Sequence, residues 1–231
     1  MNVTIRFLAK IQVSIVMFLL FSCSSDREKT LPDTFYFPIE AGSVSEFGVE
    51  RTIYSTTQSP ALRQFTTRHT IVDSFSNIDG NPVYKIDYAS KVRENEWKQD
   101  SASILWRTID KTCVQENGQT VVKILFPLSE GMVWNGNDYN TLPEAIFRCA
   151  DKGKPSQIGQ VLYPKTVKII RQDDSTLLSR NKYIEIYAAD IGLISTEKVF
   201  VKYCNTPDCV GKGIINSGYK EISVLKTLTK K

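Results

Sequence analysis

The reactive side chains of this sequence offer few ways to build a catalytic centre. The chain holds a single histidine, His69, so a histidine-based triad or a multi-histidine metal site would have to be built around it. Asp73 lies four residues further on. In an extended strand the two side chains share a face about 13 Å apart, which is too far for a direct hydrogen bond. We therefore interpret His69 as a strand residue without a catalytic role.

Oxygen-bearing side chains near residue 77 suggest a calcium loop at first sight. Asp73, Asn77 and Asp79 precede Gly80, and oxygen ligands two residues apart before a glycine allow a tight wrap around a hard cation. The distal bidentate glutamate of such loops is absent. A hairpin turn explains the segment better.

Two acids, Glu185 and Glu197, are candidates for a carboxylate pair. Sugar hydrolysis needs two acids at a set separation, which spacing in a β protein cannot show. We expect these two to face each other across a hairpin and to form surface ion pairs. The sequence contains no Walker loop, dinucleotide fingerprint, nucleophile elbow or metalloprotease helix. We expect no enzyme, and no catalytic residue, metal or cofactor.

Four of the five cysteines are candidates for disulfide bonds in an oxidising compartment. Cys204 and Cys209 flank the turn-forming sequence Asn-Thr-Pro-Asp, so we predict a disulfide at the base of a hairpin loop. A bond between Cys113 and Cys149 is left open, because four cysteines allow three pairings. A four-cysteine zinc site would need paired short spacings that are absent.

The fifth cysteine, Cys23, ends a bacterial export signal. Two cations, Arg6 and Lys10, precede an apolar run over residues 13–21 that is too short to cross a bilayer as a helix. A small residue followed by cysteine at the end of such a run is typical of lipoprotein processing. We predict that Cys23 is lipidated, with palmitate among its acyl chains, and becomes the first mature residue. Because Phe21 is larger than usual at its position, a plain secretory signal without lipid is the alternative.

The predicted organisation is a signal peptide over 1–22, a flexible tether over 23–34 and a single β domain over 35–229. Removal of the signal leaves 209 of the 231 residues, enough to bury roughly 70% of the unfolded chain's surface. The whole chain carries a formal charge of +4, two units of which belong to the signal. Because Lys and Arg are scattered among Asp and Glu rather than grouped in blocks, we expect no nucleic-acid partner.

Strand patterns recur along the domain. In Val83–Tyr88, Tyr84, Ile86 and Tyr88 alternate with Lys85 and Asp87, as in a half-buried strand. Turn signals separate similar runs. We expect antiparallel strands near residues 46–56, 64–76, 82–92, 97–109, 112–116, 119–126, 161–172, 178–188, 193–204 and 213–227. The predicted fold is all-β, either an antiparallel sandwich or a curved half-barrel.

One short helix is predicted between these strands. Thr141-Leu142-Pro143-Glu144 has the spacing of a capping box with proline in the first turn, and Gly153 follows the run Ala145 to Ala150. We expect this helix to close one end of the sheet.

Aromatic residues are plentiful, and three of them are tryptophans. Trp97, Trp106 and Trp134 would suit a sugar or peptide platform, because flat rings stack on apolar faces at little entropic cost. Packing in the core and across strands is the more usual role, and we favour it.

One sequence pattern occurs twice. Phe37-Pro38-Ile39 with Gly42 returns as Phe126-Pro127-Leu128 with Gly131. Proline fixes an extended turn and glycine permits a positive φ, so each copy is predicted to form a corner before a strand. The sequence does not decide between a duplication and independent origins.

These segments resemble a known family. The chain is similar to uncharacterised all-β lipoproteins of Bacteroidetes-type bacteria in three motifs: Phe37-Pro38-Ile39-x-x-Gly42; Lys123-x-x-Phe126-Pro127-Leu128 with Trp134-x-Gly136-Asn137; and Glu185-x-Tyr187-Ala188-x-x-Ile191-Gly192-Leu193-Ile194-x-x-Glu197. The resemblance spans most of the mature chain. It implies an exported, membrane-tethered β domain and brings no established activity.

Taken together, these features predict a lipid-anchored envelope lipoprotein with a non-catalytic binding or scaffold role. Ser24 after Cys23 favours the outer membrane if the enteric sorting rule applies, with the periplasmic or surface face open. The expected partners are the membrane, through the lipid, and an envelope protein or glycan. The alternative is a half-barrel carrier of an apolar ligand, and a carboxylate enzyme is a third hypothesis.

Overall fold

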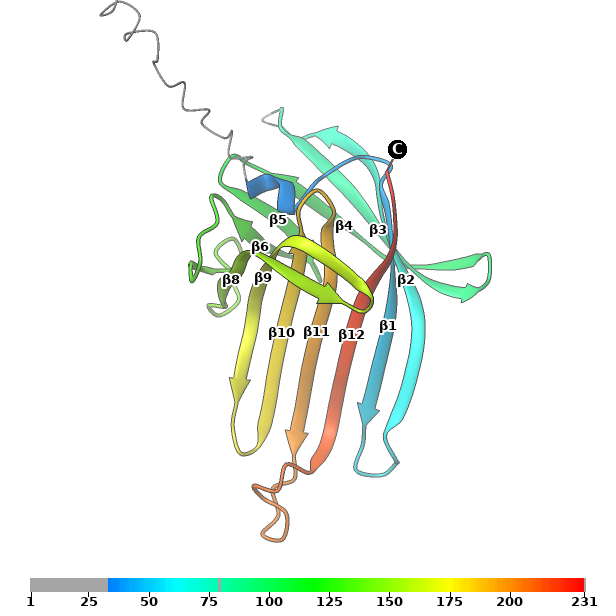
Figure 1. The fold of residues 1–231 in the computed structure, drawn as a ribbon, viewed down its shortest axis with the longest axis vertical. Coiled ribbons are helices and arrows are strands. Elements are labelled where there is room, and N and C mark those ends of the chain that lie inside the picture. The colour runs from blue at the N-terminus through cyan, green and yellow to red at the C-terminus, as the bar shows by residue number, and fades with distance from the viewer. Residues whose placement is uncertain (1–32, 79, 231) are drawn as a thin grey trace, which may run out of the picture. The chain divides into compact units, whose positions relative to one another are not determined.

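The alternating runs of the sequence form strands of one antiparallel sheet in the computed structural model, which describes residues 33–78 and 80–230 (Figure 1). The signal, Cys23 and the tether up to residue 32 lie outside the described residues. Within those ranges, no helix has the length and apolar character needed to cross a bilayer.

The described residues form twelve strands and one short 3₁₀ helix, η1 (Asp33–Tyr36). The strands are β1 (Val44–Tyr54), β2 (Ala61–Ser76), β3 (Pro82–Arg93), β4 (Glu96–Arg107), β5 (Lys111–Glu116), β6 (Gln119–Leu125), β7 (Val133–Asn135), β8 (Ile146–Ile158), β9 (Val161–Ser175), β10 (Ser179–Ala188), β11 (Gly192–Tyr203) and β12 (Ile215–Thr229). All ten predicted strands are present, with shifted ends. The sheet order is β6-β5-β4-β3-β2-β1-β12-β11-β10-β9-β8-β7.

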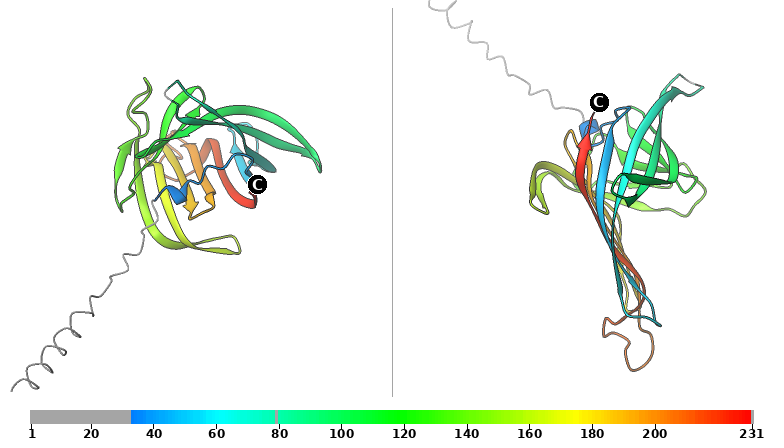
Figure 2. Two further views of the ribbon diagram at one scale, coloured as in Figure 1. Left: turned by 90° about the horizontal axis from the view of Figure 1, so that it is seen from above. Right: turned by 90° about the vertical axis from the view of Figure 1, so that its right-hand side faces the viewer.

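The two edge strands of this sheet, β6 and β7, meet each other. The backbone N–H of Val122 in β6 donates to the carbonyl of Gly136, just after β7, at 2.8 Å. Trp134 Nε1 donates to the Val122 carbonyl at 2.9 Å. These bonds satisfy edge groups that would otherwise be open to pairing. The sheet therefore curls into a nearly closed barrel shape (Figure 2), which confirms the predicted half-barrel and excludes the sandwich.

The predicted helix after Thr141 is wrong. Residues 146–158 form β8, in which Phe147 and Cys149 are buried while Ile146 and Arg148 are exposed. This period of two suits a strand and lets both buried side chains join the core. A helix of about ten residues gains little stability alone, so burial decides the structure. The helical element of the described residues is η1 instead.

The repeated sequence pattern forms two corners with a similar glycine conformation, although the Phe126–Pro127 peptide bond is cis and the Phe37–Pro38 bond is not. Gly42 has φ of 87° and Gly131 has φ of 76°, a conformation that favours glycine. The N–H of Gly42 donates to the carbonyl of Ile71 at 2.7 Å, and the N–H of Gly131 donates to the carbonyl of Cys149 at 2.9 Å. One corner precedes β1 and the other precedes β7, so each opens a run of six strands.

The main hydrophobic core lies beside the seam between β6 and β7. Its buried members come from η1, from β5 to β10 and from the segment that follows β6. They are Tyr36, Cys113, Val121, Val122, Ile124, Phe126, Leu128, Trp134, Phe147, Cys149, Val167, Ile169 and Tyr187. Burying each large apolar side chain contributes about 1.5 to 3 kcal/mol. This packing fills one side of the curled sheet.

Candidate functional site

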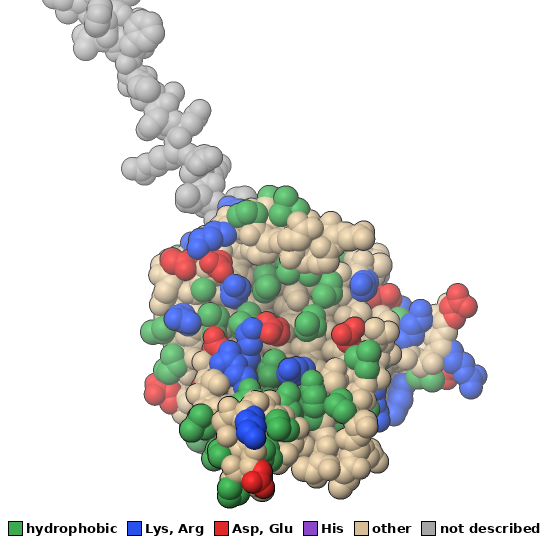
Figure 3. All heavy atoms as spheres, turned by 60° about the horizontal axis from the view of Figure 1, so that its bottom comes forward, with side chains coloured by type: hydrophobic (Ala, Val, Ile, Leu, Met, Phe, Trp, Pro, Cys, Tyr) green, Lys and Arg blue, Asp and Glu red, His purple; other side chains and the backbone are tan. Residues whose placement is uncertain are grey.

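A cavity of about 730 Å³ lies inside the curled sheet. Side chains from β1 to β6 and from β10 to β12 line it, together with the β5–β6 turn and the segment after η1. Its volume falls in the range of small-molecule sites. Figure 3 shows charged and hydrophobic side chains side by side on the face seen toward the lower end of the sheet.

Apolar side chains form much of the wall. In β1, Phe47 and Val49 point inward, and in β2 Phe65 and Ile71 do the same. The predicted alternation of β3 is confirmed, because Ile86 and Tyr88 line the cavity whereas Lys85 and Asp87 do not. Leu105 and Phe37 complete this wall. An apolar group inside the cavity would be shielded from water.

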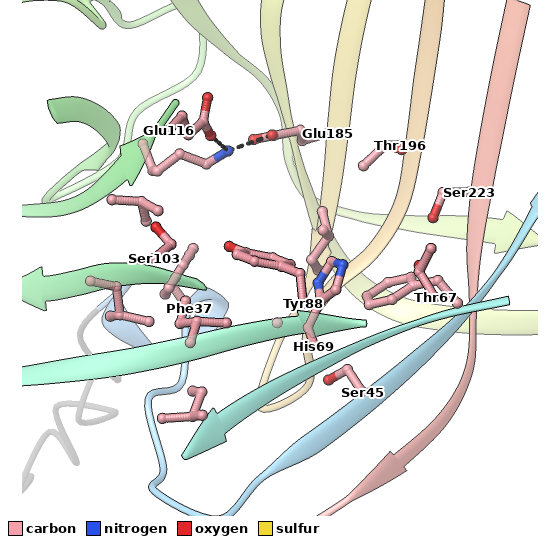
Figure 4. A pocket seen from close by; sticks show the side chains of 18 of the residues that line it. Phe37, Ser45, Thr67, His69, Tyr88, Ser103, Glu116, Glu185, Thr196 and Ser223 are labelled. Carbon is pink, nitrogen blue, oxygen red and sulfur yellow. Dashed lines mark hydrogen bonds and ion pairs between the residues drawn. The ribbon is translucent and has the colours of Figure 1, made fainter. Parts of the chain in front are cut away.

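Hydroxyl groups lie between the apolar side chains (Figure 4). Ser45, Thr67, Thr196 and Ser223 line the cavity, and none of the four side-chain hydroxyls is hydrogen-bonded to a described residue. Thr196 is paired with Ser223, and Ser223 with Val49, across neighbouring strands. The hydroxyls are therefore available to water or to a ligand.

His69 lines the cavity in the same view. Its ring lies between Phe47 and Tyr88, with both centroid distances 4.7 Å. Burial, together with the positive charges of Lys198 and Lys123, lowers the His69 pKa to about 4, so the ring is neutral at pH 7. A bulge between Ile71 and Asp73 shifts the strand register, and Asp73 is exposed. The structure does not bring Asp73 to His69.

Four charged side chains form a network at one end of the cavity, and Figure 4 shows its two acids, Glu116 and Glu185. Lys123 Nζ lies 2.8 Å from Glu116 Oε1 and 2.5 Å from Glu185 Oε1. Arg171 also contacts both acids, with Nη2 2.8 Å from Glu116 and Nη1 3.1 Å from Glu185. Two tyrosine hydroxyls, of Tyr183 and Tyr187, donate to Glu185 at 2.8 Å each.

Both carboxylates of this network are ionised. Burial opposes their charged form, but Lys123 and Arg171 outweigh it. They lower the pKa of Glu116 to about 2 and also lower the pKa of Glu185. Neither acid therefore holds a proton for general acid catalysis near pH 7. The network is suited to holding β5, β6, β9 and β10 together.

The expectation that Glu185 and Glu197 face each other and form surface ion pairs is wrong for Glu185 and holds only for the ion pair of Glu197. Glu185 is 1% exposed, whereas Glu197 points to the other face and pairs with Lys182 at 2.7 Å. A bulge between Ile186 and Tyr187 shifts the hairpin register, so Glu185 lies opposite Thr196. A shift of one residue exchanges the two faces of a strand.

A second charged group lies on the neighbouring strands β1, β12 and β11. Glu221 is paired with Arg51 through Nη2 and with Lys198 at 3.5 Å. Lys198 Nζ also lies 4.9 Å from the centroid of the Tyr183 ring. No sequence motif marks these three residues, and only their alternation within predicted strands indicates an inward face.

The cysteines divide into a bonded pair and a free pair. Cys204 and Cys209 form a disulfide, with Cα atoms 5.7 Å apart. Cys113 and Cys149 are free and buried, and burial raises the pKa of each thiol to about 11. Between residues 33 and 230, leaving residue 79 aside, no cluster of three or more metal-ligating side chains is found.

The segment considered as a calcium loop is a hairpin turn. Asn77 N–H donates to the Asn81 carbonyl at 3.0 Å, and Gly80 N–H donates to the Asn77 carbonyl at 3.0 Å. These bonds connect β2 and β3. Asp79 lies outside the described residues.

The tryptophans pack rather than form a platform, as favoured from the sequence. Trp134 is in the core and Trp106 packs against it. The Trp97 ring stacks under Arg68, with the guanidinium carbon 3.8 Å from the centroid. The aromatic rings that line the cavity are instead Phe37, Phe47, Phe65, Tyr88, Tyr183 and Tyr187.

Comparison with known proteins gives a likeness in structure alone. No family model matches the sequence, and a search of curated proteins finds no match. Two solved structures are similar: a candidate exported protein with a YmcC-like fold from Bacteroides fragilis, with a TM-score of 0.44, and a candidate lipoprotein from Parabacteroides distasonis, with a TM-score of 0.41. Each is 11% identical, and each alignment covers 84% of this chain and 98% of the other.

Proposed function

We propose that this chain is a lipid-anchored lipoprotein of the bacterial envelope that binds a small molecule in the cavity of its curled sheet and does not catalyse a reaction. The observation that carries the proposal is the cavity of about 730 Å³, whose wall combines apolar side chains with unbonded hydroxyls. The anchor rests on the sequence around Cys23, and the outer membrane is the proposed location.

Binding fits the cavity better than catalysis does. The buried acids Glu116 and Glu185 are ionised and engaged by Lys123 and Arg171. His69 is neutral at pH 7. Its ring makes no hydrogen bond to a described residue, so no described side chain orients it as a general base. Neutral or paired groups of this kind hold a ligand without attacking it.

A carrier of an apolar or partly apolar ligand is the second candidate. The apolar wall formed by Phe47, Phe65, Ile71, Ile86 and Leu105 favours it. A carrier must release its ligand to a membrane or to another envelope component, whereas a scaffold keeps its partner bound. The envelope protein or glycan expected as a partner would then give or receive the ligand.

The test is to purify the lipoprotein from native membranes and identify bound small molecules by mass spectrometry. Thr67→Trp places a large ring in the cavity. Thr66→Trp makes the same change at the next residue of β2, which does not line the cavity. We expect a bound molecule in the wild type and in T66W and its loss in T67W.

Two results would remove the proposal. One is a wild-type protein that carries no small molecule and takes up none of the membrane's extracted components. The other is a molecule retained equally by T67W and T66W, which would place its site elsewhere.

A further inference from the structure

The charges at the cavity fall into three groups. All of them line it except Arg171, which does not face the cavity but contacts two acids that do. Glu40 pairs with Lys230 at 3.1 Å. The network of Glu116, Glu185, Lys123 and Arg171 holds two acids and two bases. Because each of these two groups has equal numbers of opposite charges, neither attracts a further ion strongly.

The third group is not balanced. Glu221 is a single carboxylate between two cations, Arg51 and Lys198. Arg51 holds it closely, since Nε donates to Glu221 Oε2 at 2.5 Å. Lys198 Nζ is 3.5 Å from the other oxygen and donates no hydrogen bond to any described residue. One positive charge with free donors therefore faces the cavity at Lys198.

Beyond this ammonium group, hydroxyl and then apolar side chains follow along the neighbouring strands. Lys198 lies opposite Glu221, and the next inward-facing pair along the same two strands is Thr196 and Ser223. Val49 follows Ser223 on the neighbouring strand. A head group at Lys198 would thus meet free hydroxyls, while its tail would lie against the apolar wall.

We propose that the cavity binds an amphipathic organic anion, whose carboxylate or phosphate group is held by Lys198 with Thr196 and Ser223. Its apolar part lies along Phe47, Ile86 and the side chains around them. This inference rests on the proposed function and specifies its ligand class. An ammonium donor to an anionic acceptor makes the stronger kind of hydrogen bond.

The experiment compares octanoate, 1-octanol and octylammonium, which share one alkyl chain and differ in head-group charge. The full lipoprotein is held in discs of zwitterionic lipid, and empty discs are subtracted in isothermal titration calorimetry. We expect octanoate to bind about tenfold more tightly than either other probe, the size of one charge-assisted hydrogen bond.

Three variants locate the effect. Lys198→Met keeps the apolar stem, so octanoate should weaken about tenfold while 1-octanol is unchanged. Glu221→Gln removes the acid that competes for Lys198, so octanoate should bind more tightly. Lys220→Met, an exposed lysine beside Glu221 on β12 that does not line the cavity, is the matched control and should change neither.

The outcomes separate this inference from the proposed function. The anion site is overturned if the three probes bind equally, or if octanoate binds K198M as it binds the wild type. The cavity remains the ligand site in either case if T67W loses binding. Preference for octylammonium overturns the anion site as well. If no probe binds, the anion site is overturned, and the mass spectrometry of the natively purified protein still decides the proposed function. If T67W binds the probes like the wild type, the probes bind outside the cavity and the anion site is overturned as well.

Discussion

Lys123 in β6 and Glu185 in β10 form an ion pair across the inside of the curled sheet, with Nζ 2.5 Å from Oε1. Their side chains are 9% and 2% exposed. The two strands are not neighbours in the sheet order, since β7, β8 and β9 separate them on one side. The pair therefore helps to fix the curvature that creates the cavity.

Removing one member of this network should destabilise the protein. Glu185→Gln leaves Lys123 and Arg171 with Glu116 as their shared acid, so one buried positive charge is uncompensated. We expect a loss of roughly 3 to 5 kcal/mol in the free energy of unfolding. Urea denaturation followed by the fluorescence of the buried Trp134 measures it.

Glu197→Gln is the matched control for that variant. Glu197 lies on the other face of the same hairpin, its side chain is 40% exposed, and it pairs with Lys182. A partly exposed pair of this kind contributes about 0 to 1 kcal/mol. Equal losses in the two variants would contradict the buried network.

His69 should make stability depend on pH below neutrality. Its pKa falls from 6.5 in the unfolded chain to about 4 in the folded protein. Between these values the unfolded chain binds a proton that the folded protein does not, so stability is full above about pH 6.5 and decreases as pH falls to 4. Below pH 4 both states are protonated at this residue, and its contribution no longer changes.

The measurement for His69 is the free energy of unfolding at several pH values between 7 and 4. His69→Gln removes the titrating ring, so its profile should be flatter over this range than that of the wild type. A wild-type profile that is already flat, or an unchanged slope in the variant, would show that His69 titrates normally. The acids Glu116 and Glu185 act at lower pH, because both pKa values are lowered.

The free thiols should be protected from alkylation in the folded protein. Cys113 and Cys149 are 2% and 0% exposed, and burial raises each pKa to about 11, so little reactive thiolate forms at pH 7. We expect N-ethylmaleimide to modify both in urea and neither in buffer. Peptide mass spectrometry reads each site, and rapid native labelling at Cys149 would contradict its burial.

The disulfide is tested in the same digest. Cys204 and Cys209 should react only after reduction, and reduction should cost about 2 kcal/mol because the bonded loop is short. A Cys204–Cys209 peptide with intact mass before reduction is the expected product. Labelling of either residue without a reductant would exclude the bond.

Strands were predictable because their signal is local. Ile86 and Tyr88 alternate with charged residues, and the structure turns those two inward. The strand β8 was not predicted, because Thr141 to Gly153 carries helix-capping residues. Its pairing of Cys149 with Ile169 and the burial of Phe147 depend on distant segments that a local pattern does not contain.

The site was less predictable, because strand register decides it. A bulge between Ile186 and Tyr187 places Glu185 inside and Glu197 outside, and no residue type marks that bulge. The face of Lys198 follows from the same register. The alternation of β2 showed that His69 belongs to a strand, but the curvature of the whole sheet determines that its face encloses a cavity.

Lipidation at Cys23 would determine whether the protein, and with it the cavity, is held at a membrane. The run over residues 13–21 followed by Ser22 and Cys23 predicts thioether attachment of a diacylglycerol, and acyl chains bring enough apolar surface for membrane binding. Cells fed an alkyne analogue of palmitate should yield labelled wild-type protein in the membrane fraction. Cys23→Ser should lose the label and leave that fraction after signal cleavage or remain as precursor. Label that persists in the variant would place the lipid elsewhere, and an unlabelled wild type would favour the plain secretory signal, with the ligand then bound by a freely diffusing protein.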